Sequence, residues 1–242
     1  MTNIIIIPTY NEKDSIELLI KTIFNLIPDI YIMVVDDNSP DGTAKIIEKL
    51  KTQYPNLSLL KRAAKQGLGK AYVAGFKKIM ESRQNFENII MMDGDFSHNP
   101  KYLPEMIKLS KNHDLVIGSR YIHGGSVAKE WEFWRKLLSY GANIYVQIIL
   151  GFKIKDWTAG FNLIKTSILK KINLDLLLPR GYAFQFSFKH HLLKNNARAI
   201  EFPIHFEERV KGKSKMSSSI ITEAVFAPWK ILFSEIKDFP TN

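Results

Sequence analysis

The stretch VVDDNSPDGT occupies residues 34–43 and places two adjacent carboxylates, Asp36 and Asp37, directly after an apolar pair. Two carboxylates at the mouth of a buried strand are costly to desolvate, so their presence there calls for a partner or a ligand. The Ser-Pro-Asp-Gly sequence that follows is typical of a turn. We therefore interpret the stretch as the end of a buried strand that leads into a polar loop.

On both sides of this stretch, short apolar runs alternate with amphipathic segments. Apolar runs predict buried parallel strands at residues 3–8, 31–35, 57–61, 88–95 and 114–119. Helical spacing predicts helices at residues 14–24, 43–54, 69–81 and 104–111. Asp14 and Glu17 form a plausible capping pair for the first helix. This alternation predicts an α/β fold with a doubly wound, mostly parallel sheet.

Past residue 125 the alternation becomes less regular. A long amphipathic helix is predicted at residues 132–150, a further strand at residues 199–206 and a closing helix at residues 218–236. The longest charge-free run, residues 137–152, is shorter than the ~20 apolar residues that span a bilayer, so we predict no transmembrane helix. The C-terminal part is thus predicted to be an amphipathic-helix extension of the sheet.

The composition narrows the classes of function. The chain has 242 residues and no cysteine, which excludes disulfides, thiolate metal sites and cysteine nucleophiles. Its net charge of +10 favours anionic partners such as nucleic acid, anionic lipid or phosphorylated substrates, although a solvated lysine-rich surface explains the charge about as well. Charge alone therefore leaves the partner open.

Four polar clusters follow the predicted strand ends: PTYNE at residues 8–12, DDNSPDGT at 36–43, DGDFSH at 93–98 and GSRY at 118–121. In an open α/β sheet, ligands bind outside the carboxyl ends of the strands. Any one aspartate there could be a helix N-cap, but four clusters on one rim favour a ligand site. Two carboxylates separated by one glycine, as in Asp93-Gly94-Asp95, suit Mg²⁺ together with substrate phosphate oxygens.

In order along nearly the whole chain, these clusters and the stretches WEFWRKLLSYGAN, DWTAGF, GYAFQ and FEERVKGKSKMS resemble glycosyltransferase family 2. The resemblance is closest to the dolichyl-phosphate (polyprenol-monophosphate) mannosyltransferases. It implies the GT-A fold and inverting transfer of mannose from GDP-mannose to the phosphate of dolichyl or polyprenyl phosphate, with Mg²⁺ or Mn²⁺. The nearest alternative uses UDP-glucose or another nucleotide sugar with the same class of acceptor.

The resemblance also implies the site residues. Those expected around the nucleotide sugar are Pro8, Tyr10, Glu12, Val35, Asp37, Asp93, Gly94, Asp95, Arg209 and Lys215. The metal ligands are expected to be Asp93, Asp95 and Ser97, and the acceptor-phosphate ligands Arg120, Arg135 and Ser214. The expected catalytic set is Asp95, Arg120, Arg209 and Lys215.

The sequence departs from the family pattern at three positions. Ser97 stands where many members carry glutamine, Asn162 where arginine is usual, and Ser187 where glutamate commonly follows. The run RVKGKSK at residues 209–215 supplies four cations and no acid, which suits two anions held together during transfer. An exposed, solvated loop is the alternative interpretation of that run.

One catalytic domain is expected over residues 1–242, with a nucleotide-binding half (1–125) and an acceptor-binding half (126–242) that carries interfacial helices. Tryptophan beside basic residues at 131–136 and 229–230 suits a membrane surface, although ordinary core helices are an equal alternative. We expect peripheral attachment to the cytoplasmic face of a membrane, directly or through a membrane-embedded partner subunit. That membrane would be the ER in a eukaryote and the plasma membrane in a prokaryote.

Two other classes of function remain as alternatives. A basic nucleic-acid-binding protein would combine a basic patch with interleaved aromatic residues. A non-catalytic membrane scaffold would leave the carboxylates of the rim unexplained. We therefore expect an enzyme without a nucleic-acid partner, and we interpret its histidines, including His113, His190 and His191, as structural or surface residues.

Overall fold

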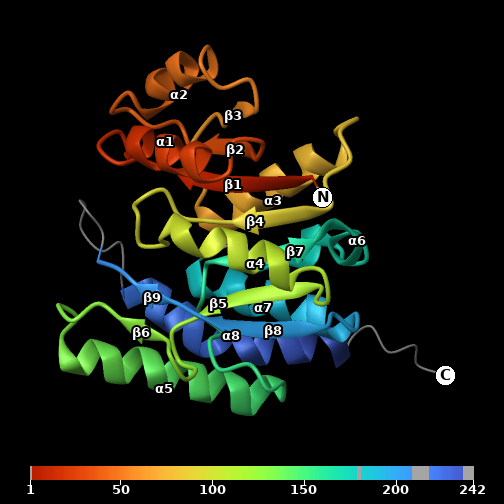
Figure 1. Ribbon diagram of the computed structural model, residues 1–242. Helices are drawn as coiled ribbons and strands as arrows, with labels where there is room; N and C mark the ends of the chain where they lie inside the picture. Colours follow the sequence, from red (N-terminus) through yellow and green to blue (C-terminus); the bar gives the residue numbers. More distant parts are fainter. Residues whose placement is uncertain (1, 179–180, 209–217, 237–242) are drawn as a thin grey trace.

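The structure, a computed structural model, describes residues 2–178, 181–208 and 218–236. A seven-stranded sheet runs through the molecule in the order β3-β2-β1-β4-β7-β5-β8, and helices cover both of its faces (Figure 1). Its strands are β1 (Asn3–Thr9), β2 (Tyr31–Asp36), β3 (Leu57–Lys61), β4 (Asn88–Met91), β5 (Leu115–Ser119), β7 (Asn162–Lys165) and β8 (Ala199–Pro203). Two short strands, β6 (Ser126–Val127) and β9 (His205–Phe206), pair in a separate small sheet.

The prediction of a doubly wound, mostly parallel sheet is confirmed. Neighbouring strands are parallel except at β7, which runs antiparallel to both β4 and β5. The sequence analysis missed β7 because its four residues, Asn162–Lys165, are too few to show a strand period. The predicted strand at residues 199–206 divides at Ile204 into β8 of the large sheet and β9 of the small one.

The helices divide between the two faces of the sheet. Helices α1 (Ile16–Leu26), α2 (Thr43–Lys51) and α4 (Leu103–Leu109) share one core, and the short η1 (Pro100–Tyr102) leads into α4. The other core contains α3 (Leu68–Met80), α5 (Phe133–Leu150), α6 (Thr166–Leu169), η2 (Leu174–Leu176), α7 (Gly181–Lys194) and α8 (Ser218–Ile236). Alternate isoleucines of β1 point into the two cores, Ile5 and Ile7 into the first and Ile4 and Ile6 into the second.

Two local predictions fail for physical reasons. Ser15, not Asp14, is the N-cap of α1, and Glu17 accepts a hydrogen bond from Lys21 Nζ at 2.7 Å, so the predicted capping pair is wrong. Helix α7 was missed because most of its side chains are buried, which removes the one-sided pattern that marks a surface helix.

In the described part of the chain, every helix is too short or too polar to cross a membrane.

Candidate active site

The loops after β1, β2 and β4 meet at the carboxyl ends of three adjacent strands. The Glu12 amide donates to Thr43 Oγ1 at 3.1 Å, which joins the first loop to the second. Ser15 Oγ donates to the carbonyl oxygen of Gly94 at 2.8 Å, which joins the first loop to the third. These bonds bring three of the four strand-end clusters predicted from the sequence, PTYNE, DDNSPDGT and DGDFSH, to one rim.

Asp36 and Asp37, the adjacent carboxylates of the second loop, are both satisfied by the protein. Asp36 accepts hydrogen bonds from the hydroxyls of Thr9 (3.0 Å) and Ser39 (2.6 Å). Asp37 pairs with Arg62 and accepts the amides of Gln66 and Gly67, each at 3.1 Å. The two carboxylates can therefore be buried because each has its own set of donors, and Asp37 holds the segment that leads into α3.

The Asp93-Gly94-Asp95 turn follows β4 and has a fixed conformation. Asp95 is 4% exposed, and its Oδ1 accepts from both the amide (3.0 Å) and the hydroxyl (2.6 Å) of Ser97. A methyl group added at Gly94 would lie 3.5–3.7 Å from Ile7, Thr9 and Glu12, which is ordinary contact. The local hydrogen bonds, rather than the glycine, therefore set the direction of the Asp95 carboxylate.

Two residues beside this turn were missed by the sequence analysis. His98 is buried, its Nδ1 accepts the Asp93 amide at 3.0 Å, and its Nε2 lies 3.9 Å from Asp93 Oδ2. Because Nδ1 is an acceptor, the proton of the neutral ring is on Nε2, on the side of the carboxylate. The sequence analysis interpreted the histidines as structural or surface residues, and the burial of His98 and its contact with the Asp93 amide fit a structural role beside the carboxylate turn.

The second missed residue is Tyr72 on α3. Its side chain is fully buried, and within the described residues its hydroxyl has no hydrogen-bond partner. Burial raises the pKa of Tyr72 well above its ordinary value, and the charges of Asp93 and Asp95 raise it further. A neutral phenol donor therefore lies close to the two carboxylates, at a position that the sequence analysis treated only as part of the predicted helix at residues 69–81.

An aromatic cluster around Phe206 of β9 connects this turn to the arginines expected at the acceptor. The Phe206 ring lies 5.6 Å from that of His98 and 5.8 Å from that of Trp131. The guanidinium carbon of Arg120 is 5.4 Å from the Phe206 ring centre, and that of Arg135 is 3.9 Å from the Trp131 ring centre. The cluster thus connects two predicted phosphate ligands to the carboxylate turn through a chain of aromatic rings.

Arg120 belongs to a buried polar network. Its Nε and Nη2 donate to the two carboxylate oxygens of Asp156 at 2.8 and 2.7 Å, and Nη2 also donates to Thr158 Oγ1. Burial raises the pKa of Asp156, but the Arg120 charge outweighs that effect and brings the pKa below its ordinary value. Lys189 Nζ, fully buried on α7, donates to the carbonyl oxygens of Trp157 (3.1 Å) and Ala159 (2.7 Å).

The remaining predicted residues lie in different surroundings. Pro8, Tyr10 and Glu12 lie on the rim, whereas the Val35 side chain is 0% exposed, so a ligand could meet only its backbone. Asn162 and Ser187, two departures from the family pattern, are buried in β7 and α7. Arg209, Ser214 and Lys215 lie outside the described residues.

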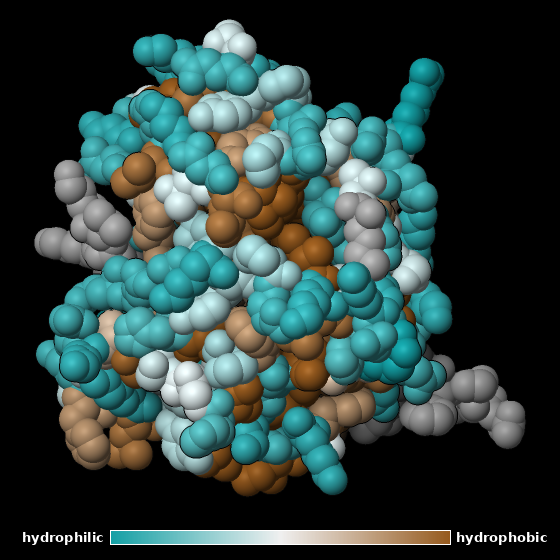
Figure 2. All heavy atoms as spheres, viewed as in Figure 1, coloured by the Kyte–Doolittle hydropathy of each residue, from teal (hydrophilic) through white to brown (hydrophobic). Residues whose placement is uncertain are grey.

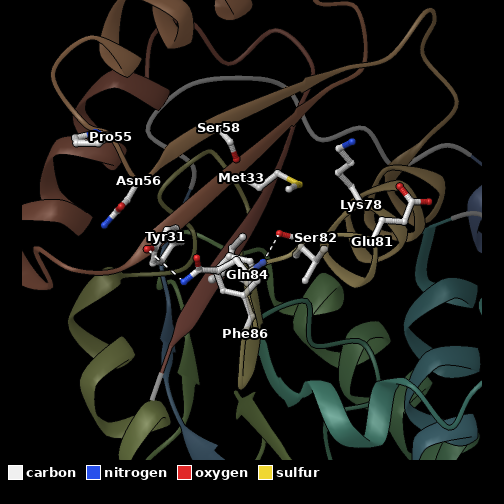
Figure 3. A pocket seen from close by; sticks show the side chains of 12 residues that line it. Tyr31, Met33, Pro55, Asn56, Ser58, Lys78, Glu81, Ser82, Gln84 and Phe86 are labelled. Atoms are coloured by element: carbon white, nitrogen blue, oxygen red, sulfur yellow. Dashed lines mark hydrogen bonds between the residues drawn. The ribbon is translucent and has the colours of Figure 1, made fainter.

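A pocket of about 420 Å³ lies away from this rim (Figure 3). It opens near the amino ends of β1, β2 and β3, and its lining includes Tyr31, Met33, Ser58 and Lys78. Gln84 Nε2 donates to the Tyr31 hydroxyl at 3.4 Å across one side of it. The pocket contains none of the predicted site residues, so we place the candidate active site at the opposite, carboxyl ends of the strands.

Solved structures with the same architecture are GT-A glycosyltransferases. Mannosyl-3-phosphoglycerate synthase from Rubrobacter xylanophilus superposes with a TM-score of 0.67 at 16% identity, covering 98% of this chain and 74% of that one. Glucosyl-3-phosphoglycerate synthase from Mycobacterium tuberculosis, solved with Mn²⁺, UDP and phosphoglyceric acid, gives 0.66 at 14% identity, covering 96% and 78%. The chain is thus an α/β protein of the GT-A fold class.

The sequence comparisons define the family. The model of "Glycosyl transferase family 2" matches residues 4–173, and the chain belongs to this family of glycosyltransferases. An "undecaprenyl-phosphate mannosyltransferase" of Micrococcus luteus is 39% identical over 220 residues, covering 91% of this chain and 89% of the relative. A "polyprenol monophosphomannose synthase" of Mycolicibacterium smegmatis is 39% identical over 232 residues, covering 94% and 86%.

Proposed function

We propose that the chain transfers mannose from GDP-mannose to the phosphate of polyprenyl phosphate, or of dolichyl phosphate in a eukaryote, with inversion at the anomeric carbon. The observation that carries this proposal is the 39% identity to two polyprenyl-phosphate mannosylating enzymes, over at least 91% of the chain. The rim supports it, because carboxylates, aromatic rings and arginines lie together at the carboxyl ends of the strands.

In this proposal Asp93 and Asp95 hold Mg²⁺ or Mn²⁺ at the donor diphosphate. Among the described residues, no three His, Cys, Asp or Glu side chains are grouped as a metal site. A cation such as Mg²⁺ takes one or two protein carboxylates and completes its shell with phosphate oxygens and water, so two aspartates are enough to hold it. Ser97, the third expected ligand, orients Asp95 through its hydroxyl. The metal would stabilise the charge on the departing diphosphate.

The acceptor needs little help from a general base. A phosphate monoester has a second pKa of about 6, so it is largely dianionic at neutral pH and is itself the nucleophile. The chain must instead hold two anions close together, which is the role we propose for Arg135, Arg209, Ser214 and Lys215. Arg120 would act from a fixed position, since Asp156 and Thr158 hold its Nε and Nη2.

An apolar surface on α5 and α8 supports a peripheral position on the membrane. Figure 2 shows apolar side chains along the lower edge of the molecule, where Figure 1 places α5. We define the α5–α8 surface by its exposed side chains: Phe133, Trp134, Leu137, Leu138, Tyr140, Ile144, Ile148, Val225, Phe226, Trp229 and Phe233. Trp229 Nε1 donates to the Tyr145 hydroxyl at 2.9 Å, so the two helices contact each other. This surface would lie in the interface that holds the polyprenyl acceptor.

A panel of nucleotide sugars tests the donor and the acceptor together. With polyprenyl phosphate and Mn²⁺, we expect label to pass to the lipid from GDP-mannose, and we expect GDP-mannose to bind more tightly than UDP-glucose in calorimetry. The configuration of the anomeric carbon in the product reports inversion. Transfer from UDP-glucose alone would contradict the proposal and favour the alternative donor.

A further inference from the structure

The segment between β3 and α3, residues 62–67, is held firmly against the rim. Asp37 pairs with Arg62 at one end of it and accepts the Gln66 and Gly67 amides at the other. The Arg62 amide also donates to the Asp36 carbonyl oxygen at 2.9 Å. The middle of the segment is therefore presented at a defined place by a buried carboxylate.

That place is the face of the Tyr10 ring. Lys65 Nζ lies 4.0 Å from the Tyr10 ring centre, within the range of a cation–π contact. Tyr10 follows β1, at the centre of the rim, and Lys65 is otherwise exposed. A flat aromatic face covered by an exposed lysine side chain is a surface that a planar heterocycle could occupy once that side chain rotates aside.

We propose that Lys65 recognises the nucleotide base of the donor, with Tyr10 as the surface on which the base stacks. This inference rests on the proposed GDP-mannose donor. Guanine presents two acceptors on one edge, O6 and N7, which lysine and arginine bind well. Uracil presents a single carbonyl, O4, on the corresponding edge. Lys65 would exchange its contact with the ring for a contact with that edge, so it would favour guanine over uracil.

A contact between Lys65 and the diphosphate is the main competing account, and it makes a different prediction. GDP and UDP share the diphosphate, so a lysine that binds phosphate would matter equally for both. A lysine that reads the base would matter for GDP and hardly at all for UDP. The difference between the two nucleotides therefore isolates the base.

The test is calorimetry of GDP and UDP binding in the presence of Mn²⁺. Lys65→Met keeps the apolar stem and removes the charge, and we expect about 10-fold weaker GDP binding with less than a twofold change for UDP. Lys65→Arg should retain the preference for GDP. Lys101→Met is the matched control, because Lys101 lies 5.1 Å from the Tyr102 ring in a similar cation–π pair that includes none of the predicted site residues.

The outcomes separate this inference from the proposed function. If the wild type prefers GDP but Lys65→Met binds GDP normally, the role of Lys65 is wrong and the donor proposal stands. Equal losses for GDP and UDP would overturn base recognition in favour of a phosphate contact. A wild type that binds UDP more tightly than GDP would contradict the proposed GDP-mannose donor. It would also contradict the recognition of guanine by Lys65.

Discussion

The rim and the network around Arg120 both bury carboxylates, but they satisfy them in different ways. At the rim, Asp36 and Asp95 accept hydrogen bonds from serines three and two residues further along the chain. In the network, Asp156 pairs with an arginine 36 residues away. Local donors satisfy a carboxylate without neutralising it, whereas an arginine cancels its charge. Asp36 and Asp95 therefore keep their negative charge available for a ligand. Asp37, which pairs with Arg62, resembles instead the network, whose charges fix the fold.

The same contrast separates their energetics. The network contains two buried cations, Arg120 and Lys189, whose charges interact with Asp156. Removing one member of such a set leaves an uncompensated buried charge. A carboxylate of the rim that loses its charge keeps its serine donors, so the fold should survive. We therefore expect substitutions in the network to lower stability, and substitutions of rim carboxylates to lower activity with little change in stability.

The largest effect is expected at Lys189. Burial lowers the pKa of Lys189 from 10.5 to about 7. Between pH 7 and pH 10.5 the unfolded state binds more protons than the folded state. The free energy of unfolding of the wild type should therefore rise by about 1.4 kcal/mol per pH unit, roughly 5 kcal/mol in all. Below pH 7 the penalty for the buried charge is fully present. Denaturant unfolding from pH 6.5 to 9.5 should show this slope in the wild type and lose it in Lys189→Met; identical slopes would contradict it.

Breaking the Arg120–Asp156 pair should have the next largest effect. Asp156→Asn leaves the Arg120 guanidinium buried without its counter-charge, and we expect a loss of about 3–5 kcal/mol in the free energy of unfolding. Asp114→Asn is the matched control, since Asp114 also accepts from both Nε and Nη2 of one arginine, Arg198, whose side chain is 64% exposed. The control should lose about 1 kcal/mol or less. Equal losses of the free energy of unfolding in Asp156→Asn and Asp114→Asn would contradict the expected difference between the buried and the exposed pair.

This contrast also explains what the sequence could reveal. The strands and helices of the first half, the polar clusters of the rim and the Asp93-Gly94-Asp95 turn could be predicted, because each depends on an apolar run followed by its own polar loop. The partners of Arg120 could not, since Asp156 and Lys189 lie in distant segments that meet only after β7 and α7 are placed. His98 and Tyr72 carried weak signals, one beside the carboxylate turn and the other inside a helix that looked ordinary.

The third prediction tests the rim. Asp95→Asn keeps an oxygen that can accept from Ser97 but removes the charge, and we expect transfer to fall about 100- to 1,000-fold with little change in stability. Asp41→Asn is a matched control, because Asp41 also accepts from a hydroxyl two residues on, Thr43, at 2.6 Å. The control should retain most of its transfer activity. Near wild-type transfer by Asp95→Asn would remove Asp95 from the site.

The smallest effect is expected on the α5–α8 surface, where neither charge nor buried packing is changed. Ile148 is 76% exposed, so Ile148→Ser should leave the free energy of unfolding almost unaltered. Fully burying such a side chain is worth roughly 1.5–3 kcal/mol, and burial in a lipid interface is incomplete, so we expect about 10-fold weaker binding to anionic vesicles. Leu18→Ser on α1, 63% exposed, is the control for a general loss of apolar surface. If both variants bound vesicles as the wild type does, the α5–α8 surface would not be the membrane contact. If Ile148→Ser bound vesicles weakly and yet turned over a short, water-soluble polyprenyl phosphate normally, the two regions would have separate roles. The rim would carry out the transfer, and α5 and α8 would attach the protein to the lipid surface.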